Sequence, residues 1–246
     1  MIVKYLLMLG IGHLLGDFYF QNEKMSKYKE EKYKGVILHS LEYCIAVILA
    51  FLPIFRSEVF WAVIFLGLAH FSIDTVKFIL LKKKKIRKNS RVFVFDQCAH
   101  VISIFALAYI MDSNNFSISY IKIVSNILNT YNCKGEIISR WIFVVLVLHK
   151  PSNIFIQSLL EGDKPRTDET IIKADNKAGR RIGTVERFIM LLFLSKGQYA
   201  AIGFILTAKS IARYDKITKD EKFAEYYLLG TLVSTLCVVI CSKVVI

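Results

Sequence analysis

The sequence is poor in residues that break helices and in residues that cross-link a chain. It has only three prolines in 246 residues and no low-complexity linker, so the choice lies between one large soluble core and a membrane protein. Four of its five cysteines, Cys44, Cys98, Cys237 and Cys241, lie in apolar segments, and no two form a C-x-x-C pair. This argues against a disulfide framework and a cysteine-based zinc site. A Walker loop, a dinucleotide fingerprint and a nucleophile elbow are also missing, which leaves no substrate signal.

Long apolar stretches dominate what is present, since 54% of the residues are hydrophobic. Seven stretches come close to the ~20 residues that span a bilayer: 2–20, 36–55, 59–81, 92–111, 141–160, 187–208 and 226–245. We therefore predict an all-α, polytopic integral membrane protein. The first stretch contains His13 and Asp17 and has no small-residue cleavage site, so we expect it to remain in the mature protein rather than to act as a cleavable signal peptide.

Positive charge is in excess, with a formal net charge of +13. Lysine and arginine gather in alternate loops, at 24–34 and 82–91, while the loop between them has only Arg56 and Glu58. Cytoplasmic loops of membrane proteins carry such an excess, so we expect a multi-pass protein of the cell membrane with its amino terminus outside and both basic loops in the cytoplasm. Contact with lipid and water explains the charge better than nucleic acid as a partner does.

The organisation along the chain predicts two parts of one integrated membrane domain. Residues 1–111 have short loops, as in an antiparallel transmembrane four-helix bundle. Residues 112–246 add carboxy-terminal membrane helices and a polar cytoplasmic loop at 161–187, which contains Gly179 and Gly183. The stretch 187–208 has Lys196, Gly197 and Gln198 in its middle, so it either crosses the membrane once or forms a hairpin that turns there. The basic residues that follow favour the hairpin.

Ionisable side chains recur inside the first four apolar stretches at a spacing of four residues, which places both members of a pair on one helix face. The pairs are His13 and Asp17, His70 and Asp74, and Asp96 and His100, and the second stretch adds His39. An aspartate at membrane depth costs ~2.5–3.5 kcal/mol, so each needs a partner or a role. The expected topology puts all seven at the cytoplasmic side, which indicates a common site.

Imidazole and carboxylate groups on facing helices are typical of metal sites in helical bundles. They suit zinc, manganese or iron, and we predict His13, Asp17, His39, His70, Asp74, Asp96 and His100 as ligands of one or two divalent ions. Gln21, Glu42 and Gln97 are candidates for outer partners that orient the ligands. One of Asp17, Asp74 or Asp96 is a candidate catalytic base. The alternative is a polar network that joins the helices or relays protons.

A second cluster of charge lies near the carboxy terminus. The candidate anion-binding residues are Arg180, Arg181, Arg187, Lys209, Ser210 and Arg213, with Glu186 and Glu225 as counter-charges. One interpretation is an internal ion-pair network between the carboxy-terminal helices. The other is a pocket for a phosphate or a lipid head group. Both stay open at this point.

Several motifs carry a resemblance to a known family. They are HLLGDFYFQ, the His39 segment, HFSID and FDQCAH in the first half, and ERF at 186–188, Gln198, KSIAR at 209–213 and EYYLLGTLVS at 225–234 in the second. In these the chain resembles bacterial and phage-borne membrane proteins of a domain of unknown function (DUF3307-like). The resemblance implies a shared fold and site but no activity. More distantly, the first half is similar to membrane-bound metal-dependent hydrolases.

The leading hypothesis is a membrane-embedded, metal-dependent hydrolase that acts on an anionic, phosphorylated or lipid-linked substrate at the cytoplasmic face. A metal ion lowers the pKa of bound water towards ~7, so no serine or cysteine nucleophile is needed. The first alternative is a transporter or channel for divalent cations or protons, although no inverted repeat is visible. The second is a structural or effector membrane protein with a metal staple. The expected partners are the bilayer and an anionic lipid or phosphorylated small molecule, and homo-oligomerisation stays open.

Overall fold

The structure is a computed structural model, and it describes residues 2–54, 57–86, 89–116, 119–163 and 169–246. All regular structure in these residues is helical, without a strand, which confirms the all-α prediction. Arg56, Arg87 and Lys88 of the loops used for the topology lie outside the described residues. The chain divides into two compact units, Met1–Phe143 and Val144–Ile246. That both belong to one integrated membrane domain stays a prediction.

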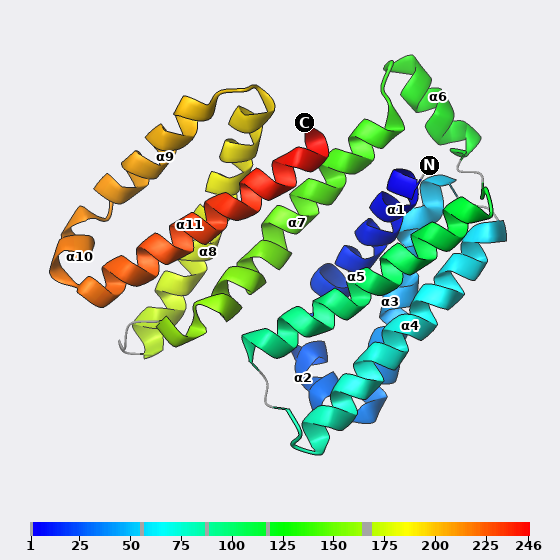
Figure 1. Cartoon of the computed structure of the whole chain (residues 1–246), viewed down its shortest axis with the longest axis horizontal. Coiled ribbons are helices and arrows are strands. Elements are labelled where there is room, and N and C mark those ends of the chain that lie inside the picture. Colours follow the sequence, from blue (N-terminus) through cyan, green and yellow to red (C-terminus); the bar gives the residue numbers. More distant parts are fainter. Residues whose placement is uncertain (1, 55–56, 87–88, 117–118, 164–168) are drawn as a thin grey trace. The chain divides into compact units, whose positions relative to one another are not determined.

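The first unit begins with a short series of helices that carry the candidate ligands (Figure 1). They are α1 (Ile2–Leu14), the π-helical turn η1 (Leu15–Phe20), α2 (Glu23–Glu31), α3 (Tyr33–Phe51), the 3-10 turn η2 (Leu52–Ile54), α4 (Ser57–Lys82), α5 (Ser90–Ser113) and α6 (Lys122–Thr130). Side-chain caps start two of them, because Asn22 accepts from the backbone N–H of Met25 and Asn89 accepts from that of Val92. Helix α7 (Gly135–Leu159) begins in this unit and ends in the second.

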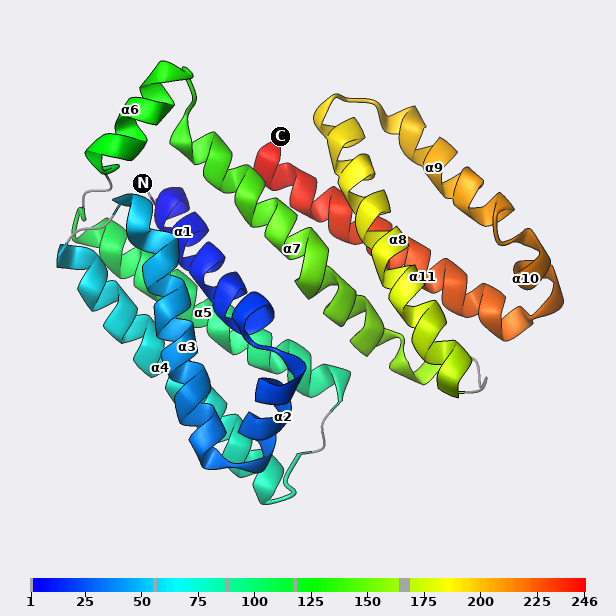
Figure 2. The ribbon, with the colours of Figure 1, turned by 180° about the vertical axis from the view of Figure 1, so that it is seen from behind.

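Four long helices share the hydrophobic core of the first unit. Helix α3 packs against α1 and α4, and α5 packs against the same two helices. The core between them includes Tyr5, Val47, Leu66 and Ala108, one from each helix and all nearly inaccessible to solvent. Close packing of these side chains joins the four helices. Helix α2 lies beside α3 and α4, as Figure 2 shows from behind.

Six helical stretches are long and apolar enough to cross a membrane, which fits a multi-pass protein by length and composition. They are Ile2–Phe20, Tyr33–Ile54, Val59–Lys82, Ser90–Ser113, Gly135–Leu159 and Glu221–Val245. Six of the seven predicted stretches correspond to them. The seventh, 187–208, is divided between two helices, so a single straight crossing is wrong for it.

The second unit consists of the end of α7 and the helices that follow it. These are the 3-10 turn η3 (Glu161–Asp163), α8 (Glu169–Ser195), α9 (Tyr199–Ile211), α10 (Tyr214–Lys219) and α11 (Glu221–Val245). Helix α8 packs against α9 and α11, and α10 packs against α11. Helices α8 and α9 meet in a turn at which Gly197 has φ +71°, a backbone conformation that favours glycine. This is the hairpin geometry that the sequence favoured.

The predicted polar loop at 161–187 is wrong from Glu169 onwards, because these residues form the first part of α8. Gly179 and Gly183 led to the loop prediction, yet a glycine inside a helix costs only ~1 kcal/mol relative to alanine and does not have to end it. Pro151 likewise lies inside α7. Its missing N–H leaves the carbonyl of Val147 without the usual donor, and the hydroxyl of Ser152 donates to that carbonyl at 2.8 Å.

Candidate functional site

The candidate ligands come from four helices of the first unit. His13 lies in the last turn of α1, and Asp17 lies in the π-helical turn η1, a type of distortion that is frequent at functional sites. His39 belongs to α3, and the other four belong to α4 and α5. The predicted pairs form: the closest nitrogen-to-oxygen separations are 3.9 Å for His13 and Asp17, 3.4 Å for His70 and Asp74, and 3.9 Å for His100 and Asp96.

Packing of the helices then joins these pairs across the core. The Nε2 atoms of His39 and His70 lie 3.2 Å apart, and each is also close to Oδ1 of Asp17, at 3.2 Å and 3.5 Å respectively. Oδ2 of Asp74 lies 3.7 Å from His39 Nε2 and 3.4 Å from His70 Nε2. Five of the six separations among these four atoms therefore fall between 3.2 and 3.7 Å.

The three separations among Asp17 Oδ1, His39 Nε2 and His70 Nε2 are those expected around one metal ion. Four ligand atoms in tetrahedral positions at ~2.0–2.1 Å from a zinc ion are about 3.3 Å from one another. The cluster continues beyond the four atoms, since His70 stacks on His100 with ring centroids 4.5 Å apart and His13 lies 5.2 Å from His100. Three sets of potential ligand atoms each lie within 4.8 Å of one another. They are His13, His70 and His100; Asp17, His39 and His70; and Asp74, Asp96 and His100.

The cluster is buried, and part of its hydrogen-bonding capacity is unused. All four of its histidines and Asp74 are at most 4% exposed. Among the described residues, buried atoms without a hydrogen-bond partner include Asp74 Oδ1, Asp96 Oδ1, His70 Nδ1 and His100 Nε2. Each unmet group costs ~1–3 kcal/mol. Imidazole nitrogens and carboxylate oxygens that lack partners are the donor set that a divalent cation needs, so the residues present fit such an ion.

Two lysines supply positive charge to the cluster, and the sequence prediction did not include them. Lys29 donates to Asp74 Oδ2 at 2.9 Å, and Lys77 donates to Asp96 Oδ2 at 2.7 Å. Lys77 follows Asp74 by three residues, so its place on the same helix face was a usable signal. Lys29 is one of several lysines in the first basic loop, and nothing in the sequence distinguishes it.

Helix α2 lies outside the candidate spans and brings Lys29 to the cluster. Burial disfavours the charge of Lys29, but the nearby carboxylates of Asp74 and Asp17 outweigh burial and raise its pKa. Lys29 therefore stays protonated at neutral pH. The close approach of α2 to α3 requires Gly35, because a Cβ there would lie 2.6 Å from the backbone N and Cα of Lys29. The expectation of a simple solvated basic loop is therefore wrong for Lys29.

The predicted outer partners differ in their placement. Gln97 lies between two ligands, with Oε1 3.3 Å from His13 Nε2 and Nε2 donating to Asp17 Oδ2 at 3.4 Å. Glu42 Oε2 lies 4.0 Å from His39 Nδ1. Gln21 follows the end of η1 in an extended conformation, so the four-residue spacing does not continue to it. In the described part of the chain its side-chain oxygen is buried without a hydrogen-bond partner.

Tyr43 is a further member of the cluster that sequence reasoning missed. Its ring stacks on that of His70 with centroids 3.7 Å apart and an interplanar angle of 9°. Its hydroxyl lies 3.4 Å from His13 Nδ1. Tyr43 follows His39 by four residues on α3, so the same spacing that revealed the ligand pairs pointed to it. It fixes the orientation of two histidine rings at once.

Comparison with known proteins identifies the first half of the chain. The model of a family described as "Protein of unknown function (DUF3307)" matches residues 5–128. The chain belongs to the DUF3307 family. The DUF3307 match includes all seven candidate ligands and ends before α7. No curated protein and no solved structure matches the chain.

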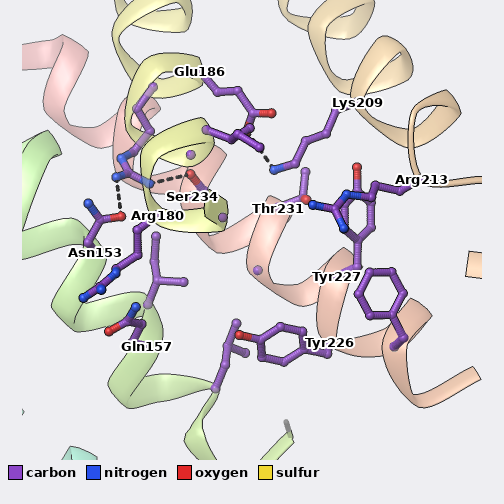
Figure 3. A pocket seen from close by; sticks show the side chains of 18 of the residues that line it. Asn153, Gln157, Arg180, Glu186, Lys209, Arg213, Tyr226, Tyr227, Thr231 and Ser234 are labelled. Atoms are coloured by element: carbon purple, nitrogen blue, oxygen red, sulfur yellow. Dashed lines mark hydrogen bonds and ion pairs between the residues drawn. The ribbon is translucent and has the colours of Figure 1, made fainter. Parts of the chain in front are cut away.

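Beyond the DUF3307 match, the second unit contains a cavity of about 370 Å³. Its lining includes five of the predicted anion-site residues: Arg180, Glu186, Arg187, Lys209 and Arg213 (Figure 3). Arg181, Ser210 and Glu225 are not among the described residues that line it. Lys209 donates to Glu186 Oε2 at 2.8 Å, as the ion-pair interpretation requires, whereas Arg187 binds only neutral acceptors in the described residues.

Proposed function

We propose that this DUF3307 chain is a multi-pass membrane protein that uses the His/Asp cluster to hold one or two divalent metal ions and hydrolyses an anionic, phosphorylated or lipid-linked substrate at the cytoplasmic face. One observation carries the proposal. The ligand atoms Asp17 Oδ1, His39 Nε2 and His70 Nε2 lie 3.2–3.5 Å from one another, close to the separations around a tetrahedral ion, and Asp74 Oδ2 lies within 3.7 Å of both imidazole nitrogens. We also propose that the chain is related to membrane-bound metal-dependent hydrolases and comes from a bacterium or a phage.

Exposed apolar side chains support the membrane part of the proposal. Trp61, Phe95 and Ile102 are 68–73% exposed on helices of the first unit. Large exposed apolar surfaces of this kind are unfavourable in water and are covered by lipid in a membrane protein. We propose that α1, α3, α4 and α5 form an antiparallel bundle that crosses the membrane, with the amino terminus outside and the basic loops in the cytoplasm.

The residues of the cluster would have different roles at the site. Asp17, His39, His70 and Asp74 would hold one ion, while His13, Asp96 and His100 lie beside it and would complete a second position. A divalent ion lowers the pKa of bound water towards ~7 and thereby supplies the nucleophile. Both oxygens of Asp17 are engaged, by His39 and Gln97, and Asp74 would hold the ion, whereas Asp96 has an Oδ1 atom without a hydrogen-bond partner among the described residues. Asp96 is therefore the carboxylate best placed to accept a proton.

Charge balance favours one ion over two. The cluster has three carboxylates and two ammonium groups, which sum to −1 when the imidazoles are neutral. One divalent ion changes this sum to +1, and two change it to +3. A buried excess of three charges is expensive, so a second ion would need an anionic substrate to accompany it.

Elemental analysis of the purified full chain in detergent tests the metal site. We expect about one ion of zinc, manganese or iron per chain in the natural sequence, almost none in His70→Ala, and full content in His149→Ala, which changes the one histidine outside the cluster. Absence of metal from the natural chain after titration with all three ions would overturn the proposal. Full content in a His39→Ala/His70→Ala double variant would do the same.

A phosphatase assay tests the reaction. With the small chromogenic ester p-nitrophenyl phosphate as the probe, Asp96→Asn should keep its metal and lose at least ~100-fold in turnover, as expected for removal of a general base. Metal-dependent turnover that is unchanged in Asp96→Asn would exclude Asp96 as the base. A metal-loaded chain that hydrolyses neither this ester nor a phosphorylated lipid would exclude the hydrolase.

The two lysine pairs favour a second candidate, a structural protein in which the polar cluster joins four helices. Lys29 and Lys77 already neutralise two of the three carboxylates, as a network without chemistry would require. For this candidate we expect metal to raise the unfolding temperature while no ester is hydrolysed. Cation flux into proteoliposomes would instead indicate the transporter alternative.

A further inference from the structure

The cavity of the second unit has far more positive than negative charge in its lining. Helices α7, α8, α9 and α11 contribute to its wall, and Figure 3 shows Arg180, Lys209 and Arg213 around the hollow. Four cations and one acid, Glu186, line it in the described part of the chain, an excess of three positive charges. An internal network of ion pairs would need about as many acids as cations in the lining, whereas its one described acid, Glu186, pairs with Lys209.

Arg187 forms the most buried part of the cavity wall and is itself 1% exposed. Its guanidinium donates to the Leu148 carbonyl at 2.7 Å, to Asn153 Oδ1 at 2.8 Å and to the hydroxyl groups of Thr184 and Ser234 at 3.2 Å. Within the described residues no carboxylate contacts this guanidinium. Neutral acceptors fix the side chain but leave its charge in a low-dielectric environment, where it attracts an anion strongly.

A hydroxyl group with unused hydrogen-bonding capacity also faces this cavity. Thr231 is 9% exposed and lines the hollow beside Tyr227, and apart from the Tyr227 hydroxyl its Oγ1 has no hydrogen-bond partner in the described part of the chain. A buried hydroxyl with an unmet hydrogen bond lowers the stability of the fold, and a ligand that forms this bond recovers that free energy. The Thr231 hydroxyl and the Arg187 charge are two independent features of the cavity. A ligand with anionic oxygen atoms would accept a hydrogen bond from the hydroxyl and balance the charge.

The remaining lining sets the size and the chemistry of the ligand. A volume of about 370 Å³ is that of a small-molecule site and exceeds what a bare phosphate ion needs. Phe223, Tyr226 and Leu160 provide an aromatic and apolar part of the wall. Guanidinium groups match the oxygen atoms of a phosphoryl group bidentately, and the dianion of a phosphate monoester suits an excess of three positive charges better than a carboxylate does.

We propose that this cavity binds a phosphate monoester, with its phosphoryl group between Arg180, Arg213 and the Thr231 hydroxyl and its organic part against the apolar wall. Lys209 neutralises Glu186 and so removes the one acidic side chain that would repel the ligand. The ester is either a soluble metabolite or the head group of phosphatidic acid, because both present the same phosphoryl chemistry. This site is separate in sequence from the His/Asp cluster and does not depend on it.

Binding to the full chain in detergent distinguishes the two sources. The soluble arm is calorimetric titration with glycerol 3-phosphate, with glycerol as the uncharged control. The lipid arm is native mass spectrometry with phosphatidic acid against phosphatidylcholine. Selective binding in the first arm assigns a soluble ester, selective binding in the second assigns a lipid, and binding in neither arm overturns the proposal.

Single substitutions test which residues bind the phosphate ester. Arg180→Gln should weaken binding by at least ~10-fold, as loss of a charged hydrogen-bonding group does, while the neighbouring Arg181→Gln, outside the cavity lining, should leave it unchanged. Thr231→Val preserves the shape of the side chain and should weaken binding by several-fold. Equal weakening by Arg180→Gln and Arg181→Gln would show attraction to overall charge and overturn the site. His70→Ala should bind the ester as the natural chain does, whatever its metal content.

Discussion

The Nε2 atoms of His39 and His70 lie 3.2 Å apart, although the two residues are 31 positions apart in the sequence and lie on different helices. When both rings are protonated on Nδ1, each Nε2 carries a lone pair and neither can donate to the other, so a cation beside the two atoms can bind both. Because Asp17 and Asp74 approach the same two atoms, the four side chains depend on one another. Changes to this cluster should therefore appear in both metal binding and stability.

Metal should stabilise the natural chain by an amount that its affinity predicts. At a free zinc concentration ~100 times the dissociation constant, the free energy of unfolding should rise by ~2.7 kcal/mol. The thermal unfolding temperature in detergent, measured with zinc and with a chelator, reports this change. In His39→Ala the response should vanish, and in His149→Ala it should persist. An equal response in all three chains would place the ion elsewhere.

Replacement of Lys29 by methionine should separate stability from metal affinity. Lys29→Met leaves the buried Asp74 carboxylate without its ammonium partner, so the metal-free chain should lose ~3 kcal/mol of unfolding free energy. The same change should raise zinc affinity by ~10-fold, because the ion no longer competes with an ammonium group for Asp74 Oδ2. Calorimetric titration and chemical unfolding measure the two effects. Lys34→Met, which changes an exposed lysine at the start of α3, serves as control and should alter neither.

Alanine at position 35 should force α2 away from α3. The new Cβ would lie 2.6 Å from backbone atoms of Lys29 and Tyr28, and backbone cannot yield as a flexible side chain does. We expect a loss of ~1–3 kcal/mol and faster proteolysis between residues 21 and 33. The matched change Gly203→Ala, inside α9 with nothing within 4 Å of its Cβ, should be neutral or slightly stabilising. Equal proteolysis of both variants would contradict the close approach.

The pair Pro151 and Ser152 provides a double-mutant test of α7. Ser152→Ala should cost ~1 kcal/mol in the natural chain, because the Val147 carbonyl then loses its donor. In a Pro151→Ala background the backbone N–H of residue 151 can reach that carbonyl, so the same Ser152→Ala change should cost almost nothing. Chemical unfolding of the four chains gives the coupling energy. A cost that is equal in both backgrounds would show that the hydroxyl does not compensate for the proline.

Local periodicity made the first half of the candidate site predictable. The pairs His13 and Asp17, His70 and Asp74, and Asp96 and His100 follow from one helical repeat, which the sequence displays directly. Contacts between helices depend on packing and were not readable in detail. Lys29 is the clearest case, since its position depends on the approach of α2 to Gly35 and not on any pattern around the lysine itself.

The helix bounds of the second unit were harder to predict, because glycine and proline residues that usually end helices lie inside them. Gly179, Gly183 and Pro151 all lie within helices of the structure. At Pro151 a local contact compensates, because Ser152 supplies the donor that the proline lacks. The charges of the cavity were visible in the sequence, whereas the burial of Arg187 and its bond to the Leu148 carbonyl required the packed helices.

Because Lys29 pairs with Asp74, the buried carboxylate has a positively charged partner even without a metal ion. If the proposed metal site is correct, a divalent ion that binds Asp74 would replace the Lys29 ammonium group as the partner of that carboxylate. Metal binding would then exchange one cation for another, and Asp74 would already be desolvated in the folded, metal-free chain.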